Sequence, residues 1–397
     1  MSERLIVEQE QFEELCDHIR DAGLVAFDTE FVSENSFRPL LCLLQFATPQ
    51  RTALVDPFQI QNLNPWWDLM CDEDTTVIVH GGQAEVRFCL WATGNTPRKL
   101  IDVQLAEGLR SRSYPLSYSN LVSRVLGKTV RGNETRTDWR HRPLSDRQMR
   151  YATEDTDHLI EIWTRQQANL TELGRQHWAE AEFERFVAQL VNDVAEESWR
   201  KLPGLHKLSR RSLAIAIELG RWREQEAEQR DRLIRRVLRD DLLVDIARRK
   251  PNSLKDLLAT RDMNRGEYRK SADDMLACVK RALELPENQL PQRMSGRKND
   301  HQQDEQVLGK LLGLALANRC AEMNVALQLV GTSSDLRQLV RCHLNHASAS
   351  ESPQLTRGWR AELCGDLLTE VLDGNVSIRV ADLKSEHPLV FERRTSD

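Results

Sequence analysis

The hydrophobic pattern of the N-terminal part predicts a helix followed by three buried strands. Residues 11–21 show helical periodicity, and three apolar runs come after them, at 24–27, 40–47 and 52–56. The connections between these runs are short and carry turn residues such as Pro39, whereas a parallel crossover needs a dozen residues or more. The three strands are therefore predicted to form an antiparallel meander.

The next stretch changes to an alternation of strands and helices. A helix ending near Cys71 precedes an apolar run at 76–80, the Gly81-Gly82 turn, a helix from residue 83 and a strand at 99–103. A meander followed by units of this kind indicates an α/β domain, with a mixed sheet and helices on both of its faces.

Beyond the Pro203-Gly204 break the pattern is helical throughout. The expected helices of a first bundle cover 211–228, 230–248, 253–261 and 271–285. Residues 286–305 have the composition of a linker, and a second helical block covers 306–373, with a loop at 345–353. The sequence thus predicts two all-α bundles, followed by a loosely held tail after residue 382.

Composition places the chain among ordinary globular proteins. Its 397 residues exceed one typical core, 29% of them are charged, and no apolar run reaches membrane-spanning length. The eight cysteines are scattered without regular spacing, as is typical of reduced thiols in a cytoplasmic protein. We expect a monomer, and the sequence indicates no particular protein partner.

Charge is unevenly distributed along the chain. The net charge of −6 gives no global attraction to nucleic acid, but residues 110–150 contain ten Lys and Arg against three acids. This local excess of seven positive charges is either a solvated face or a site for phosphate groups.

Two carboxylates, Asp28 and Glu30, follow the first apolar run directly. Alternation along a strand places them on one side, roughly 7 Å apart. Like charges at the end of a buried strand favour a raised pKa or a bound cation. An acidic turn leaving a core strand is the alternative for this pair.

Helical spacing indicates two further acids that face inward. Glu85 falls between Phe88, Cys89 and Ala92 on its helix, although a first-turn Glu could also serve the helix dipole. Asp155 is the one acid of four on the apolar stripe of a helix that begins at Ser145 and is taken to continue through residue 163.

Tyr151 lies one turn before Asp155 on that helix. A buried Asp that caps a neighbouring helix, and a Tyr that belongs only to the core, are the alternatives for these two residues.

Oxygen ligands without His or Cys select hard cations. Asp28, Glu30, Glu85 and Asp155 would therefore hold Mg²⁺ or Mn²⁺. Two such ions can activate water and stabilise a departing oxyanion in phosphodiester cleavage.

Several motifs in this chain resemble the ribonuclease D family, the tyrosine-bearing branch of the DEDD 3′→5′ exoribonucleases. They are FDTEF at 27–31, VHGG at 79–82 with the acid at 85, LIDVQLA at 100–106 and TDWRHRPLSDRQMRYATEDTDHL at 137–159. SRRSLAIAIELGRWREQEA and RRVLRDDLLVDIARRKP resemble its HRDC module, and LTRGWRAELCGDLL resembles its second HRDC-like module.

The resemblance implies an RNase H-like exonuclease domain over 1–200, an HRDC domain over 206–286 and a second HRDC-like domain over 303–382. In the family arrangement Asp28 would bridge two metal ions. Glu30 and Asp155 would hold the ion that carries the nucleophilic water, and the acid at 85 would help to hold the other. Tyr151 would orient that water, and its reference pKa near 10 favours positioning over proton abstraction.

The resemblance also implies release of nucleoside 5′-monophosphates from RNA 3′ ends, with tRNA precursors and other small structured RNAs as substrates. A 3′→5′ DNA exonuclease and an RNA-binding protein with weakened catalysis are the alternatives. The family has Asp where this chain has Glu85, a displacement of roughly 1 to 1.5 Å that can cost about a hundredfold in rate. We expect an active, slower enzyme that favours Mn²⁺.

Overall fold

The computed structural model describes residues 5–130, 137–293, 302–344 and 353–394, and its contacts divide the chain into two compact units. The first unit comprises Met1–Glu30, Cys42–Val191 and Asp300–Asp397. The second comprises Phe31–Leu41 and Asn192–Asn299. The expected linker and the expected loop lie partly outside the described residues, at 294–301 and 345–352.

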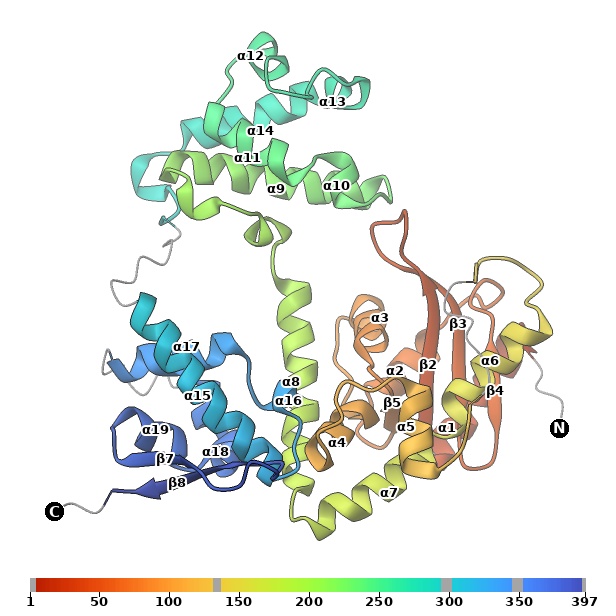
Figure 1. The fold of residues 1–397 in the computed structure, drawn as a ribbon. Helices are drawn as coiled ribbons and strands as arrows, with labels where there is room; N and C mark the ends of the chain where they lie inside the picture. Colours follow the sequence, from red (N-terminus) through yellow and green to blue (C-terminus); the bar gives the residue numbers. More distant parts are fainter. Residues whose placement is uncertain (1–4, 131–136, 294–301, 345–352, 395–397) are drawn as a thin grey trace. The chain divides into compact units, whose positions relative to one another are not determined.

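A six-stranded sheet with the order β1-β4-β3-β2-β5-β6 forms the centre of the first unit (Figure 1). Its strands are β1 (Leu5–Ile6), β2 (Leu24–Val32), β3 (Leu40–Ala47), β4 (Thr52–Val55), β5 (Thr76–Val79) and β6 (Lys99–Asp102). β4 is antiparallel to β3 and parallel to β1, while β5 is parallel to both β2 and β6. The predicted mixed sheet is confirmed, and the sequence pattern missed only the very short β1.

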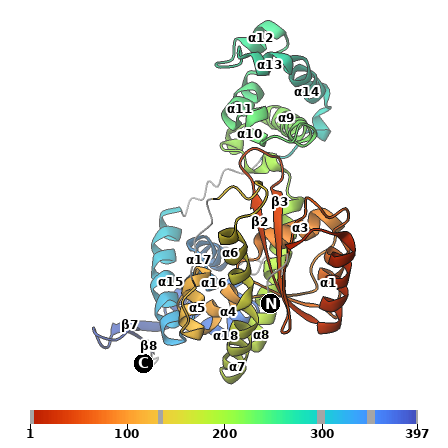
Figure 2. The same cartoon turned by 90° about the vertical axis from the view of Figure 1, so that its right-hand side faces the viewer.

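Helices cover both faces of this sheet. Figure 2 shows α1 and α3 on one side and α4, α5 and α6 on the other. The helices are α1 (Gln9–Ala22), α2 (Asn64–Met70), α3 (Gln83–Thr93), α4 (Val103–Arg110), α5 (Tyr118–Leu126), α6 (Asp146–Asp157), α7 (Leu159–Glu172) and α8 (Gln176–Ala195).

An aromatic cluster packs against β2. The ring of Phe27 lies 4.6 Å from that of Trp66 on α2 and 5.1 Å from that of Phe46 on β3, centroid to centroid. All three side chains are fully buried. Aromatic pairs of this kind contribute about 0.5–1.5 kcal/mol each beyond the burial of their area. They fix the strand immediately before Asp28.

The single helix expected from Ser145 through residue 163 is wrong, because α6 ends at Asp157 and α7 begins at Leu159. The Tyr118 hydroxyl donates a 2.7 Å hydrogen bond to the Glu154 carbonyl oxygen and accepts one of 3.4 Å from the His158 N–H. These two backbone groups would bond to each other in a continuous helix. The inserted hydroxyl therefore accounts for the break.

The second unit is helical and has its own core, which begins at Trp199. Its elements are η1 (Ser198–Lys201), η2 (Leu205–Lys207), α9 (Arg210–Gln229), α10 (Ile234–Val237), α11 (Asp240–Arg249), α12 (Leu254–Leu258), α13 (Gly266–Lys270), α14 (Ala272–Glu284) and η3 (Glu287–Gln289). The helix expected over 230–248 is wrong, since the chain turns extended at the buried Leu238. Arg223 holds that turn through the Leu238 carbonyl oxygen and Asp240.

The C-terminal block combines helices with a β-hairpin. Its elements are α15 (Gln302–Glu322), α16 (Leu327–Val330), α17 (Ser333–Leu344), η5 (Gln354–Thr356), α18 (Gly358–Cys364), α19 (Leu367–Leu372), β7 (Val376–Val380) and β8 (Leu389–Arg393). The expectation of a loosely held tail is wrong for 389–393, because β8 pairs with β7. The Asn318 side chain also bonds both backbone polar groups of Leu389.

This block, expected as a separate bundle, shares one hydrophobic core with the α/β part of the first unit. The fully buried Glu182 on α8 forms an ion pair with Arg360 on α18, with an N–O distance of 2.9 Å. It also accepts a hydrogen bond of 3.2 Å from the Trp359 indole N–H. Trp178 stacks on Trp359 at 5.4 Å. A buried charge needs such partners, so the arrangement joins α8 and α18 in a fixed register.

Candidate active site

The carboxyl ends of the parallel strands β2, β5 and β6 meet at one edge of the sheet, where ligand sites of α/β proteins form. The pairing of β2 with β5 extends to Ala26 and Ile78, so Asp28 and Glu30 lie beyond it. Both side chains are partly exposed to solvent, while Phe27 behind them is buried. The strand therefore presents two carboxylates to a ligand and anchors them in the core.

A tight turn after β5 places Glu85 at the same edge. Gly81 has a φ of +68°, and a Cβ on Gly82 would lie 2.4 Å from the Val79 side chain, so both positions need glycine. The buried Asp102 at the end of β6 accepts hydrogen bonds from the N–H groups of both glycines, at 3.0 and 3.1 Å. Asp102 thus fixes the start of α3, which carries Glu85 in its first turn.

Glu85 is 4% exposed, as its predicted inward orientation requires. Its Oε1 accepts a 2.6 Å hydrogen bond from the hydroxyl of the buried Thr29. Thr29 lies between the two acids of β2, so this bond ties the α3 carboxylate directly to the strand.

Two interactions hold α6 in place. Ser145 and Gln148 form the predicted capping box at its start. Before the helix, Arg142 makes a bidentate ion pair with Asp56, with N–O distances of 2.5 and 2.8 Å, and donates to the Cys42 carbonyl oxygen on β3 at 2.7 Å. The helix is therefore anchored to the sheet.

α6 carries the remaining two predicted residues. Asp155 is 9% exposed, and the Tyr151 hydroxyl donates a hydrogen bond to its carboxylate. The ring of the buried Trp139 lies 6.1 Å from the Tyr151 ring and fixes its position. The exposed Asp157 confirms that the acids of this helix face different sides.

Burial raises the pKa of all four carboxyl groups. The pKa of Asp28 lies well above its usual range, because the carboxyl is desolvated and the other three repel its charge. Burial and the charge of Asp155 raise the pKa of Glu30 to about 8. Burial also raises the pKa of Glu85 and that of Asp155 to about 7, although neighbouring hydroxyls donate hydrogen bonds to both. The structure thus brings all four predicted acids together as one electrostatic group.

Within the described ranges, no three His, Cys, Asp or Glu side chains already form a group that could hold a metal ion. Two of the four carboxylates are engaged by hydroxyl donors, those of Thr29 and Tyr151. The four carboxylates nevertheless fit a hard cation, because all their ligand atoms are oxygens. Their negative charges also repel one another, and this repulsion raises the pKa of Asp28. A divalent ion would relieve that repulsion.

A buried amide supports this fit. The Gln45 side chain on β3 is fully buried, and neither its nitrogen nor its oxygen finds a hydrogen-bond partner among the described residues. It lies close enough to Glu30 to lower the pKa of that carboxyl. An orphaned buried amide beside carboxylates indicates a place where a ligand or water completes the site.

Sequence reasoning missed Thr29, Gln45 and Asp102. Thr29 sits inside the FDTEF motif and Asp102 inside LIDVQLA, so their places in those motifs were the available signal. Gln45 is a lone amide in an otherwise apolar strand. A polar residue in a buried run needs a partner, and this was a signal for that position.

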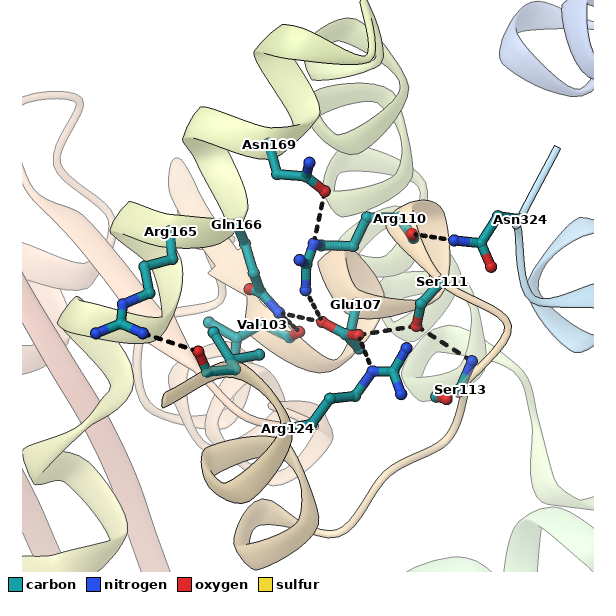
Figure 3. Close-up of polar contacts among 11 residues, drawn as sticks. Val103, Glu107, Arg110, Ser111, Ser113, Arg124, Arg165, Gln166, Asn169 and Asn324 are labelled. Carbon is teal, nitrogen blue, oxygen red and sulfur yellow. Dashed lines mark hydrogen bonds and ion pairs between the residues drawn. The ribbon is translucent and has the colours of Figure 1, made fainter. Parts of the chain in front are cut away.

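The basic segment 110–150 is largely neutralised. Arg110 and Arg124 pair with Glu107, which is fully buried and also accepts from Ser111 and Gln166 (Figure 3). Each of the other ion pairs joins one basic residue to one acid: Arg112 to Glu386, Lys128 to Glu161, Arg140 to Asp138, and Arg142 to Asp56.

These pairs show that most of the predicted charge excess stabilises the fold. Glu107, for example, connects α4, α5 and α7 through its partners. Arg147 and Arg150 are exposed on α6. Arg131 and Arg136 lie outside the described residues.

Two family profiles match this chain. The profile of a 3′-5′ exonuclease family matches residues 4–170, and that of the HRDC domain matches residues 212–279. The chain therefore has a 3′→5′ exonuclease domain followed by an HRDC domain.

Curated relatives and a solved structure define the family more closely. Ribonuclease D of Pseudomonas paraeruginosa is 31% identical over 90% of this chain and 94% of the relative, and that of Zymomonas mobilis is 30% identical over 95% of each. The crystal structure of Escherichia coli RNase D, an exoribonuclease involved in structured RNA processing, has a TM-score of 0.81 at 27% identity and covers 94% of this chain and 99% of that one. The chain belongs to the ribonuclease D family.

Membership confirms the predicted fold class and the predicted activity, that of a 3′→5′ exoribonuclease acting on RNA. It also implies the use of a divalent metal. Among the described residues no helix has the length and apolar character needed to span a membrane.

Proposed function

We propose that Asp28, Glu30, Glu85 and Asp155 are the metal ligands of this exoribonuclease and that they hold two Mg²⁺ or Mn²⁺ ions. Bound there, the ions would activate a water molecule and stabilise the departing oxyanion of an RNA phosphodiester. The observation that carries the proposal is the convergence of these carboxylates. Glu85 accepts a 2.6 Å hydrogen bond from Thr29, which lies between Asp28 and Glu30. Burial raises the pKa of Asp28, and the charges of the other three carboxylates raise it further. We propose that the catalytic part extends over residues 1–200 and that 206–286 and 303–382 are accessory domains.

Tyr151 is a hydrogen-bond donor in this proposal. Burial and the charge of Asp155 raise the pKa of its hydroxyl, so the group stays protonated at neutral pH. It already donates to Asp155, and the Trp139 ring limits its movement. Its role is to orient the attacking water, since a phenol with a raised pKa is a poor base.

The substrate we propose is the 3′ end of a structured RNA, above all a tRNA precursor, and the products are nucleoside 5′-monophosphates released one at a time. The exposed Arg147 and Arg150 on α6 would contact phosphate groups near the carboxylates. We further propose that the protein acts as a monomer in the cytoplasm, where its eight cysteines would stay reduced.

Incubation of a 3′-extended tRNA with the full-length protein tests this proposal. With Mg²⁺ or Mn²⁺ we expect stepwise shortening from the 3′ end and mononucleotides with a 5′ phosphate, because the metal is required to activate the water. A chelator should stop the reaction. An oligonucleotide with a blocked 3′ hydroxyl is the control, and internal cleavage of that RNA would contradict the proposal.

Glu85→Asp should raise the Mg²⁺-dependent rate by about tenfold and reduce the preference for Mn²⁺. The shorter side chain restores the carboxylate position usual in the family, and a shift near 1 Å has an effect of up to a hundredfold in rate. Measurement of kcat/KM in each metal checks this. Thr29→Val is the matched control, since it removes the hydroxyl partner of Glu85 while the Glu85 side chain keeps its length. Unchanged rate and metal preference in Glu85→Asp would show that this position does not limit catalysis.

A further inference from the structure

Two cysteines lie in contact behind the proposed site. Cys71 ends α2 as its C-cap residue, Cys89 lies on the neighbouring α3, and their Sγ atoms are 3.4 Å apart. A disulfide has an S–S distance near 2.05 Å, so an approach of about 1.4 Å would join the two thiols. No disulfide joins any of the eight cysteines, all of which lie within the described residues.

The two thiols differ in their exposure to solvent. Cys71 is partly exposed, while Cys89 is fully buried. The two sulfur atoms share a hydrogen bond in which either thiol can be the donor, and this contact is the main reason that the pKa of Cys71 falls to about 7. Burial and Asp68 oppose that fall, whereas Thr93 and Arg98 support it. Cys71 is thus a partly exposed thiol with a lowered pKa, and a second thiol lies beside it.

The other cysteines lack this combination. Five of them are buried, namely Cys16, Cys42, Cys278, Cys320 and Cys364. Burial also raises the pKa of Cys16, Cys278, Cys320 and Cys364. Cys342 is the other partly exposed thiol. Cys342 therefore serves as the control for whether peroxide reacts selectively with Cys71.

The position of Cys89 links this pair to the carboxylates. Glu85 precedes Cys89 by four residues, so the two side chains lie on the same side of α3. Drawing α3 toward α2 would act directly on the turn that carries Glu85, whose bond to Thr29 is 2.6 Å long. A misplacement near 1 Å can cost about a hundredfold in rate.

We propose that Cys71 and Cys89 are the site of a reversible disulfide, formed by a hydroperoxide, that slows the exonuclease by displacing Glu85. The effect on rate rests on the proposed role of Glu85, but the formation of the disulfide does not.

The chemistry is balanced with hydrogen peroxide as the oxidant. The Cys71 thiolate attacks one peroxide oxygen, the O–O bond breaks, and a sulfenic acid and hydroxide form. The Cys89 sulfur then attacks the Cys71 sulfur, the S–O bond breaks, and the hydroxide that leaves takes up the Cys89 proton. Two thiols and one peroxide give one disulfide and two water molecules. An external dithiol reverses the step by thiol–disulfide exchange.

The test treats the full-length protein with hydrogen peroxide and follows two readouts, peptide mapping and degradation of a single-stranded oligoribonucleotide with Mg²⁺. We expect a cross-linked peptide pair containing Cys71 and Cys89, a loss of rate of about tenfold or more, and recovery of the rate with dithiothreitol. Cys71→Ser should keep its rate in peroxide. Cys342→Ser, the matched control, should respond like the unaltered protein.

A third variant separates the two chemical steps. Cys89→Ser keeps a hydroxyl donor beside Cys71 and removes the second sulfur, so it should leave a sulfenic acid on Cys71 that a dimedone probe captures. Absence of the cross-link in the unaltered protein, or an equal loss of rate in Cys71→Ser, would overturn the proposal. Full activity of Glu85→Gln would instead overturn the proposed metal site, and the peptide map would be unaffected.

Discussion

Asp155→Asn should lower the rate of RNA shortening by at least about a hundredfold, the scale for loss of one charged group that acts on the reacting atoms. The substitution removes the negative charge needed for a divalent cation and keeps the volume of the side chain. It also converts the acceptor of the Tyr151 hydrogen bond into a neutral amide. Single-turnover degradation of a 3′-extended tRNA in Mg²⁺ measures the effect.

The matched control is Asp157→Asn, the same substitution on the exposed side of the same helix. Its rate should stay within about twofold of the unaltered enzyme, because exposed charges interact weakly with the site. Equal losses in the two variants would indicate a general effect of charge on RNA binding. That outcome would remove Asp155 from the proposed ligand set.

Without divalent metal, the melting temperature should fall by about 10 °C or more between about pH 5 and about pH 9. Burial raises the folded-state pKa of Glu30 to about 8 and that of Asp155 to about 7, above the values of the unfolded chain. Protonated carboxyls therefore stabilise the fold at low pH, and this contribution is lost as the pH rises through 7 to 8.

Metal should reverse this trend. Mn²⁺ or Mg²⁺ competes with protons for the same oxygens, so the gain in melting temperature should be greatest at high pH. The double variant Glu30→Gln with Asp155→Asn should show a flatter pH profile in chelator and a smaller response to metal. Thermal scans across pH give both quantities. Superimposable profiles of the variant and the unaltered protein would contradict the linkage.

Local sequence patterns predicted the strands β2 to β6, the helices α1, α2 and α3, and the start of α6, because these patterns reflect local physics. The apolar run at 24–27 forms a strand buried on both faces, and Ser145 with Gln148 forms a capping box. Helical spacing alone indicated that Glu85 and Asp155 face inward, and both are buried. These results depend on residues within a few positions of one another.

The errors arose where a distant residue changes a local pattern. Tyr118 interrupts α6 from another helix, and no spacing within 145–163 could reveal this. In the same way, the acids that neutralise the basic segment include Glu386, Asp56 and Glu161, which lie outside it in sequence. A charge count within a window cannot include partners that only folding brings close.

The sequence by itself determined the carboxylates, the tyrosine and the order of the elements that carry them, because spacing within a helix or strand fixes which side chains share a face. Only the tertiary structure decided what surrounds those groups. It brought Thr29 to Glu85, Asp102 to the glycine turn and Cys71 to Cys89. These contacts join residues 18 to 56 positions apart, and their geometry depends on how the helices pack on the sheet.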